Sequence, residues 1–270
     1  MIKDIVVHLT GSEEDEVRLG YAESLSERFE AHLTGLYVHM LPQVIGVDPA
    51  GVIAMQDWFE QSDAQADNIF KRLQERFDRF RMPHEVRRFD VFSEPAGQAL
   101  SEEARVADLF VATRPYGDQA DSAHMEVSVL FGSGRACLFV PPKGLPPKSF
   151  GNVVIAWNGS REAARAVAEA MPFLQQASQV VVVSAQEGDT VVPGDDIARH
   201  LSRHGVSVTT GTVEVGSEGS GEALLGEARR VGANLLVMGG YGHSRFREWV
   251  LGGATRYVLA HAELPVLMAR

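Results

Sequence analysis

Short apolar runs and longer amphipathic stretches alternate along the whole chain. Runs such as residues 180–185 (VVVVSA) contain no regular polar alternation, which is typical of parallel strands covered on both faces. The stretches between these runs repeat their apolar residues at helical spacing. Alternating strands and helices predict a doubly wound α/β fold, in which ligands bind beyond the carboxyl ends of the strands.

The C-terminal half of the chain shows this alternation most clearly. Strands are expected at residues 153–157, 180–185, 207–213, 235–239 and 266–268. Helices are expected at residues 161–176, 197–204 and 223–231, with a last helix that Gly252 and Gly253 open and that ends near His261.

The same order of segments occurs twice. IVVHLTGS (5–12) matches VVIAWNGS (153–160), and ADLFVAT (107–113) matches ANLLVMG (233–239). SEPAGQAL from Ser93 matches SEGSGEAL from Ser217, and LFGSGR (130–135) is paired with VLGGAT (250–255). The distance between matching segments shrinks along the chain, so the first copy carries extra residues, mostly between positions 40 and 65.

A segment rich in Pro, Gly and Lys, PPKGLPPKSFGN (141–152), has the composition of a linker. It divides the chain into two predicted domains, residues 1–142 and residues 151–270. The first of these contains a long insertion, residues 41–73. The second part of the insertion predicts a helix, and its first part is either a lid or an oligomer contact, because apolar loops often cover another surface.

Charge and cysteine content narrow the range of functions. The chain has 25 Lys and Arg against 36 Asp and Glu, a formal net charge of −11, which disfavours binding to nucleic acid or to an anionic membrane. The single cysteine, Cys137, excludes an intrachain disulfide and suits a reducing compartment. The first residues fit neither a signal peptide nor a membrane span, so we expect a cytoplasmic protein.

Glycines gather after the fourth predicted strand of the second copy. Gly239 and Gly242 follow the apolar run, and Gly252 and Gly253 precede the last helix. A strand, a glycine loop and a helix N-terminus together present backbone N–H groups to a phosphate. The alternative is that the glycines only allow a tight connection.

The pattern Gly239-x2-Gly242-x9-Gly252, preceded by LLVMG and followed by HAELPVLMAR, resembles the signature end of the universal stress protein family. VVIAWNGSREAARAVAEA is similar to the family's first strand and helix, and the resemblance covers nearly the whole chain as two tandem copies. It implies two tandem doubly wound domains, each a five-stranded parallel sheet in an α/β/α sandwich of the adenine-nucleotide-hydrolase-like type. The last strands, ACLFV and LPVLM, would pair to form an intrachain pseudo-dimer.

The resemblance also implies a ligand, an adenine nucleotide such as ATP with Mg²⁺, and a set of residues in the second copy that would bind it. The residues at the ends of the first and second strands would be Ala156, Trp157, Asn158 and Ala185. Those along the ribose and inner phosphates would be Met238, Gly239, Tyr241 and Gly242, and those at the outer phosphates Gly252, Gly253 and Ala254.

Several residues depart from the family pattern. Asn158 stands where nucleotide-binding members usually carry Asp, and Gly253 stands where they carry Ser or Thr. The ring of Trp157 would either stack on a base or fill its place. In the first copy the loop reads TRPYGDQADSAH (113–124), and FGSGR runs directly into ACLFVPP, so we expect most of the last helix to be absent. No ordinary nucleotide site is predicted there.

Three functions remain open on the sequence. The first is a nucleotide-responsive or scaffold-like regulator in stress adaptation. Its protein partners are not identified by the sequence. The two copies would pair within the chain, either with no further assembly or within a homodimer. The second is a nucleotide-free interaction module in which the glycines serve packing. The third is a slow ATPase using Arg245, Arg247 and Glu248, which form no recognisable catalytic constellation. His200 and His204 lack further zinc ligands at suitable spacing, so we expect two exposed histidines and no metal site.

Overall fold

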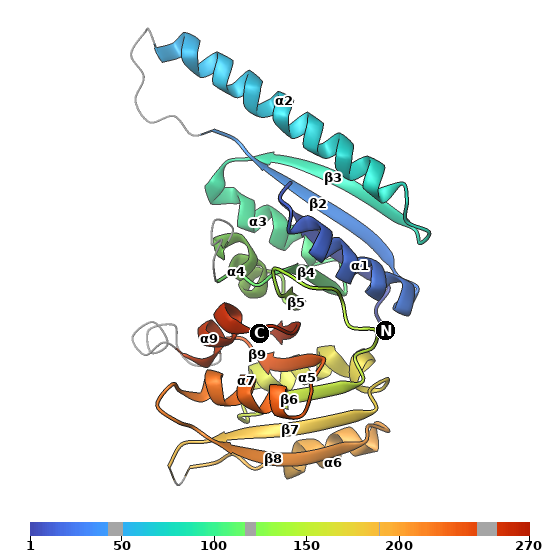
Figure 1. Cartoon of the computed structure of the whole chain (residues 1–270), viewed down its shortest axis with the longest axis vertical. Helices are drawn as coiled ribbons and strands as arrows, with labels where there is room; N and C mark the ends of the chain where they lie inside the picture. The colour runs from blue at the N-terminus through green and yellow to red at the C-terminus, as the bar shows by residue number, and fades with distance from the viewer. Residues whose placement is uncertain (43–50, 117–122, 189, 242–252) are drawn as a thin grey trace.

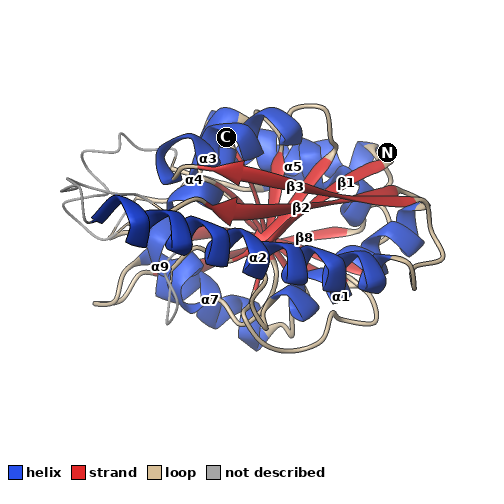
Figure 2. Ribbon diagram, turned by 90° about the horizontal axis from the view of Figure 1, so that it is seen from above, coloured by secondary structure: helices blue, strands red, loops and turns tan. Residues whose placement is uncertain are grey.

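The computed structural model describes residues 1–42, 51–116, 123–188, 190–241 and 253–270, with backbone alone at 51–55, 93–95, 123 and 124. These residues form one ten-stranded sheet with helices on both faces (Figures 1 and 2). The strands are β1 (Asp4–Leu9), β2 (His32–Met40), β3 (His84–Val91), β4 (Leu109–Thr113), β5 (Ala136–Val140), β6 (Asn152–Ala156), β7 (Gln179–Gln186), β8 (Val208–Glu214), β9 (Leu235–Gly239) and β10 (Val266–Ala269). The helices are α1 (Asp15–Phe29), α2 (Gly51–Phe77), α3 (Ser93–Ala104), α4 (Ala123–Gly132), α5 (Arg161–Leu174), α6 (Asp195–Arg203), α7 (Ser220–Arg230) and α9 (Ala254–His261).

The strand order shows how the two copies are joined. It runs β3-β2-β1-β4-β5-β10-β9-β6-β7-β8, so each half has its own five strands in the same relative order. Strands within each half pair in parallel, whereas β5 and β10 pair antiparallel, with Leu267 opposite Leu138. The predicted fold class, two doubly wound halves that form an intrachain pseudo-dimer through their last strands, is confirmed.

The apolar runs form strands because both of their faces are covered. Ile5 and Val7 of β1 contribute to one hydrophobic core, and Val6 contributes to the core on the opposite face of the sheet. In β7, Val180 and Val182 face the first core while Val181 and Val183 face the second. Side chains alternate across a strand, so an uninterrupted valine run is what a sheet between two helical layers requires.

The elements expected in the second half are confirmed with small shifts at their ends. β9 has the expected bounds, and β6, β7, β8 and β10 differ by a residue or so. Helix α5 begins after Ser160, whose side-chain oxygen accepts a hydrogen bond from the N–H of Ala163 at 3.1 Å. Such an N-cap satisfies one of the free N–H groups of the first turn. Both His200 and His204 are exposed at the end of α6, as expected.

The last helix of the first half is present, and our expectation that most of it is missing is wrong. It is α4, which ends at Gly132 and is followed directly by β5. The glycines of FGSGR therefore end a helix instead of opening one. The N–H of Ser133 still bonds to the carbonyl of Val129, and Gly134 has a φ of 70°, a left-handed conformation that is common just past helix ends.

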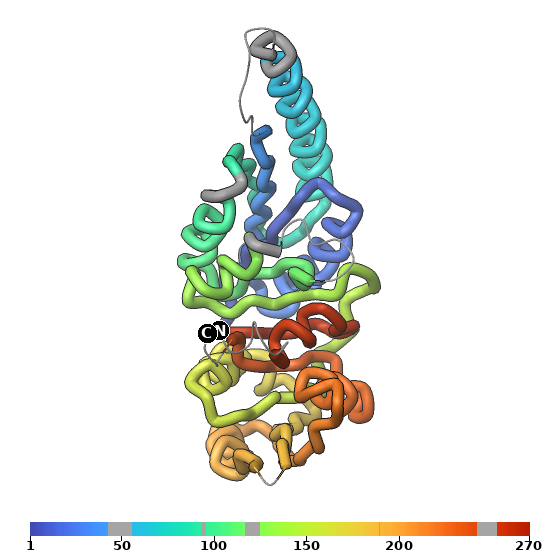
Figure 3. Tube along the Cα trace, turned by 90° about the vertical axis from the view of Figure 1, so that its left-hand side faces the viewer, coloured from blue at the N-terminus to red at the C-terminus, as the bar shows by residue number. Residues whose placement is uncertain are grey.

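The insertion forms a helix over much of its length. Helix α2 lies beside β2 and β3 at one end of the elongated molecule (Figures 1 and 3). Phe70 lies half-buried with its ring 6.4 Å from the ring of Tyr37, whereas Trp58 is 51% exposed. Residues 43–50, for which we expect a lid or an oligomer contact, lie outside the described residues. Among the helices that are described, none is long and apolar enough to cross a membrane.

Candidate functional site

The fold places several of the predicted nucleotide-binding residues at the carboxyl ends of β6 and β9. These two strands lie side by side with Ala156 opposite Met238, and both side chains are buried. β7 lies on the other side of β6 and brings Ala185 to the same edge of the sheet. The strand order reverses direction between β6 and β9, which makes this edge a topological switch point of the kind where α/β sheets bind ligands.

The turn after β6 is held by its own hydrogen bonds. The N–H of Trp157 donates to the carbonyl of Val183 at 2.8 Å, and the half-buried ring packs against the hydrophobic core. The side-chain oxygen of Asn158, which is exposed, accepts hydrogen bonds from the N–H and the hydroxyl of Ser160 at 3.1 and 2.7 Å. Asn158 therefore shapes the entry into α5 without bringing a charge to the site.

Gly239, the last residue of β9, lies very close to the start of α5. A Cβ atom at this position would be 2.5 Å from the backbone nitrogen of Ala163 and 2.7 Å from the carbonyl carbon of Glu162. Any side chain here would collide with backbone, so this glycine is required by packing. If Gly239 also contacts a ligand, it does so through its backbone.

The next two residues lie against the first half of the molecule. A Cβ atom on Gly240 would be 2.8 Å from the side chain of Leu130 in α4. Tyr241 has a left-handed φ of 51°, its hydroxyl is 2.8 Å from that of Tyr116, and its ring centroid is 5.1 Å from that of Phe131. The side chain of Tyr241 thus points into the junction between the halves, and its backbone stays at the end of β9.

The start of α9 lies beside this strand end. The N–H of Tyr241 donates to the hydroxyl of Thr255 at 3.2 Å, and that hydroxyl is buried in the first turn of α9. Gly253 is the N-cap and Ala254 the first helical residue, and no side chain in the described part of the chain caps this helix. Uncapped N–H groups at a helix N-terminus favour an anion. Gly242 and Gly252, which belong to the predicted site, lie outside the described residues.

The first half contains a cavity that the sequence did not lead us to expect. It has a volume of about 480 Å³ and opens at the carboxyl ends of β1 and β2, beneath α2. Its lining includes Thr10, Glu14, Arg18, Tyr37, His39 and Ile69. The sequence signal for this cavity was Arg18 in the first turns of α1. It was missed because nothing local in the sequence shows which strand the Arg18 side chain reaches.

Arg18 is 2% exposed and holds the end of this half's sheet together. Its Nε donates to the hydroxyl of Thr113 at the end of β4, at 2.6 Å. Its Nη1 donates to Thr10 Oγ1 at 3.0 Å and to Asp15 Oδ1 at 2.8 Å, and its Nη2 donates to Glu14 Oε2 at 3.0 Å. The guanidinium therefore occupies the switch point between β1 and β4.

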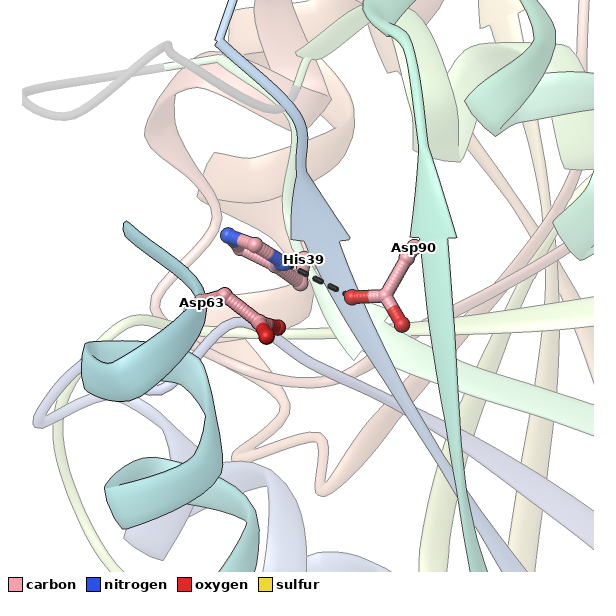
Figure 4. A group of neighbouring side chains, drawn as sticks. All are labelled: His39, Asp63 and Asp90. Carbon is pink, nitrogen blue, oxygen red and sulfur yellow. Dashed lines mark hydrogen bonds and ion pairs between the residues drawn. The ribbon is translucent and has the colours of Figure 1, made fainter. Parts of the chain in front are cut away.

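A second polar cluster joins α2 to the sheet at the edge of the cavity. His39 of β2, Asp63 of α2 and Asp90 of β3 converge closely enough to hold a metal ion (Figure 4). However, Arg88 forms ion pairs with both of these aspartates and with Asp67. His39 is hydrogen-bonded through both ring nitrogens, to Asp90 at 2.7 Å and to the hydroxyl of Ser62 at 2.9 Å. Arg88 already supplies the positive charge here, so the cluster works as an ion-pair network.

The ionisation of this network follows from its contacts. Burial alone would raise the pKa of Asp90, but the hydrogen bonds from His39 and Arg88 outweigh it and hold that pKa below the usual range. Burial alone would likewise lower the pKa of Arg88, and the bonds to Asp90 and Asp63 raise it instead. Both groups are therefore charged at neutral pH.

Comparison with known proteins decides the family of the second half. Residues 149–270 match the model of the universal stress protein family. These residues are a universal stress protein domain. The resemblance seen in the glycine pattern is thereby confirmed for the half that carries it, and β6 to β10 with α5, α6, α7 and α9 are the elements of the domain.

Solved structures extend the likeness to the whole chain at the level of fold. A universal stress protein from Archaeoglobus fulgidus is 14% identical, covers 99% of this chain and 96% of its own, and has a TM-score of 0.75. A putative universal stress protein from Pseudomonas aeruginosa UCBPP-PA14 is 15% identical, covers 99% of this chain and 93% of its own, and has a TM-score of 0.58. No curated protein sequence matches this chain. The tandem arrangement of two such folds is thus shared with other solved proteins.

Proposed function

We propose that the universal stress protein domain, residues 151–270, binds an adenine nucleotide, ATP with Mg²⁺, and that the chain is a nucleotide-responsive regulator in stress adaptation. The observation that carries the proposal is the meeting of two elements at one sheet edge. The N-terminus of α9, which no described side chain caps, is tied to the end of β9 by the hydrogen bond from the N–H of Tyr241 to the hydroxyl of Thr255. Backbone N–H groups and a helix dipole at the carboxyl end of a parallel sheet are a site for phosphate.

Each part of the nucleotide has a proposed place along this edge. The base would lie over the small residues Ala156 and Ala185, beside Trp157 and Asn158. The ribose and inner phosphates would lie along Met238 and the backbone of Gly239, Tyr241 and Gly242. The outer phosphates would lie on Gly252, Gly253 and Ala254.

The proposal rests on the residues of this chain. One solved universal stress protein is a complex with cAMP, and another, from Arabidopsis thaliana, has AMP bound. Their TM-scores against this chain are only 0.31 and 0.32, so they describe those proteins and add no argument for this one.

A nucleotide-free interaction module is a second candidate, and the glycine contacts favour it. Gly239 is required by packing against the backbone of α5, Gly240 lies close to the side chain of Leu130, and the ring of Trp157 packs on the core. Glycines that serve packing alone would need no ligand. The third candidate, slow ATP hydrolysis, depends on Arg245, Arg247 and Glu248, which lie outside the described residues.

The test is the nucleotide content of the purified, denatured protein by mass spectrometry, followed by ATP calorimetry. We expect bound ATP or ADP in the wild type and its loss in Gly242→Val. Gly211→Val is the matched control, because Gly211 lies in the edge strand β8 with open space around its Cβ position. Absence of nucleotide and of binding heat in the wild type would reject the proposal and leave the interaction module.

A further inference from the structure

The cavity of the first half has apolar walls and a polar rim. Its volume of about 480 Å³ lies within the range of small-molecule sites in proteins. The apolar wall is formed by Val38, Met40, Ala66, Ile69 and Met125. The polar rim is formed by Thr10, Ser12, Glu14, Tyr37, His39, Ser62 and Gln65, with Arg18 at the floor. Such a surface suits a ring that carries hydrogen-bonding groups.

The floor of the cavity already contains an internal anion. One carboxylate oxygen of Asp15 accepts the N–H of Thr10 at 3.0 Å, and the other accepts the N–H of Gly11 at 2.7 Å. These are the backbone donors that follow a first strand, where a phosphate would otherwise bind. Asp15 therefore takes the place of an external anion.

The only guanidinium among the lining residues is neutralised. Arg18 is paired with Asp15 and Glu14, so two carboxylates face one positive charge. An added phosphate would lie near the carboxylates of Glu14 and Asp15, and four of the five N–H groups of Arg18 are already used within the protein. Like charges brought together in a partly buried site cost several kcal/mol, and the floor therefore opposes anionic ligands.

A tyrosine hydroxyl at the cavity is left over for a ligand. Tyr37 is 2% exposed and lines the cavity, yet its hydroxyl makes no hydrogen bond with any residue that the structure describes. Burial raises the pKa of Tyr37 and outweighs the lowering effect of Arg88, so the hydroxyl is protonated at neutral pH and can donate. A hydroxyl that lines a cavity and has no partner in the described protein can donate to a ligand acceptor.

We infer that this cavity is a second ligand site, separate from the proposed nucleotide site, and that it binds a small ring-containing molecule that is uncharged or cationic and carries no phosphate. The ring lies against Ile69 of α2, which packs on the same face of the sheet as Tyr37, and an acceptor atom of the ligand takes the hydrogen bond of the Tyr37 hydroxyl. The long helix α2 supplies Ser62, Gln65, Ala66 and Ile69, so the insertion builds one wall of the site.

The experiment uses three probes that share one ring system and differ in charge: naphthylmethanol, naphthylmethylamine and naphthyl phosphate. Each is titrated into the full chain and followed by saturation-transfer difference NMR. We expect the alcohol and the amine to bind and the phosphate to bind at least about tenfold more weakly.

Gln65→Trp should abolish binding of the alcohol and the amine, because Gln65 is an exposed residue that lines the cavity. Gln61→Trp, an exposed position of the same helix that does not line the cavity, should leave it unchanged.

Two further variants test the chemistry of the site. Tyr37→Phe should weaken binding of the alcohol severalfold, and Glu14→Gln should narrow the gap between the phosphate and the alcohol. The inference is overturned if none of the three probes binds, if the phosphate binds as tightly as the alcohol, or if Gln65→Trp has no effect. ATP calorimetry on the same variants keeps this result separate from that for the second half, since Gln65→Trp should leave nucleotide binding intact.

Discussion

The two halves of this molecule share a strand order and differ at the place where that order reverses. At the end of the fourth strand the first half has Thr113, and the second has Gly239. On the helix after the first strand, Arg18 of the first half corresponds in sequence to Ala166 of the second. Each follows the glycine of the preceding turn, Gly11 or Gly159, by the same number of residues. A buried guanidinium therefore fills the switch point of the first half. In the second half the corresponding residues are small, and backbone groups line the switch point. The fold sets where a site lies, and a few side chains at strand ends set what it can bind.

The connection between the second and third strands differs just as much. In the first half it contains α2, a 27-residue helix that walls the cavity and is fixed by Arg88. In the second half it contains α6, which has 9 residues. The insertion of the first half therefore forms one wall of an open cavity, and the second half has a much shorter helix in the same connection.

The largest effect expected from this comparison is the loss of the buried charge in the first half. Arg18→Met leaves the carboxylates of Asp15 and Glu14 without their partner, which should lower the free energy of unfolding by about 3–5 kcal/mol. Arg165→Met on α5 is the matched control, because that side chain is 48% exposed and should cost no more than about 0.5 kcal/mol. Urea unfolding of both variants checks the pair, and equal effects would mean that Arg18 is not structurally buried.

The next effect concerns the fourth strand. Gly239→Thr copies the residue of the first half into a place where a Cβ meets the backbone of α5, and should cost about 2–3 kcal/mol. Gly211→Thr in the open edge strand β8 should stay within about 0.5 kcal/mol. Thermal unfolding distinguishes the two, and a neutral Gly239→Thr would show that α5 does not pack on β9 as described.

The ion pairs of Arg88 that hold α2 against the sheet should contribute less to the free energy of unfolding, because the aspartates that pair with Arg88 are partly exposed. Arg88→Met should lower the free energy of unfolding by about 1–2 kcal/mol, measured by urea unfolding.

The stability that this network contributes should also depend on pH, which is tested with Asp90→Asn. The pKa of Asp90 is depressed in the folded state, so its contribution is fully present above the unfolded value, about 3.9, and is lost as the pH falls through the folded value. The gap in stability between the wild type and Asp90→Asn should therefore narrow below about pH 4, and a gap that widens on acidification would contradict this assignment.

The smallest effect is expected at the junction between the halves. Tyr116→Phe removes the hydroxyl that lies 2.8 Å from that of Tyr241, and should cost about 0.5–1.5 kcal/mol. Tyr257→Phe serves as the control, since the Tyr257 hydroxyl makes no hydrogen bond with the described residues. Chemical denaturation measures both, and a neutral Tyr116→Phe would mean that this contact does not help to hold the halves together.

Much of the fold could be read from local pattern, because strand and helix periods are properties of short segments. The valine run of β7 and the bounds of β9 followed in this way, whereas the pairing of the last strands followed from the family resemblance. Helix α4 was missed because glycine marks a break without saying whether a helix begins or ends there. In FGSGR it marks an end.

The chemistry of the sites could be predicted less well, since it depends on contacts between residues far apart in sequence. Arg18 and Thr113, or Gly240 and Leu130, meet only after the sheet has formed. The glycine pattern indicated where a ligand would bind in the second half but could not show that Gly239 is already needed by α5. The assignment of nucleotide-binding residues stays a prediction.

The difference between the halves is tested most directly by the stoichiometry of ATP binding to the full chain in the presence of Mg²⁺, measured by calorimetry. We predict one ATP per chain, unchanged when Gln65→Trp blocks the cavity of the first half. Two ATP per chain, loss of binding in Gln65→Trp, or no binding at all would contradict the view that the second half alone accepts the phosphates.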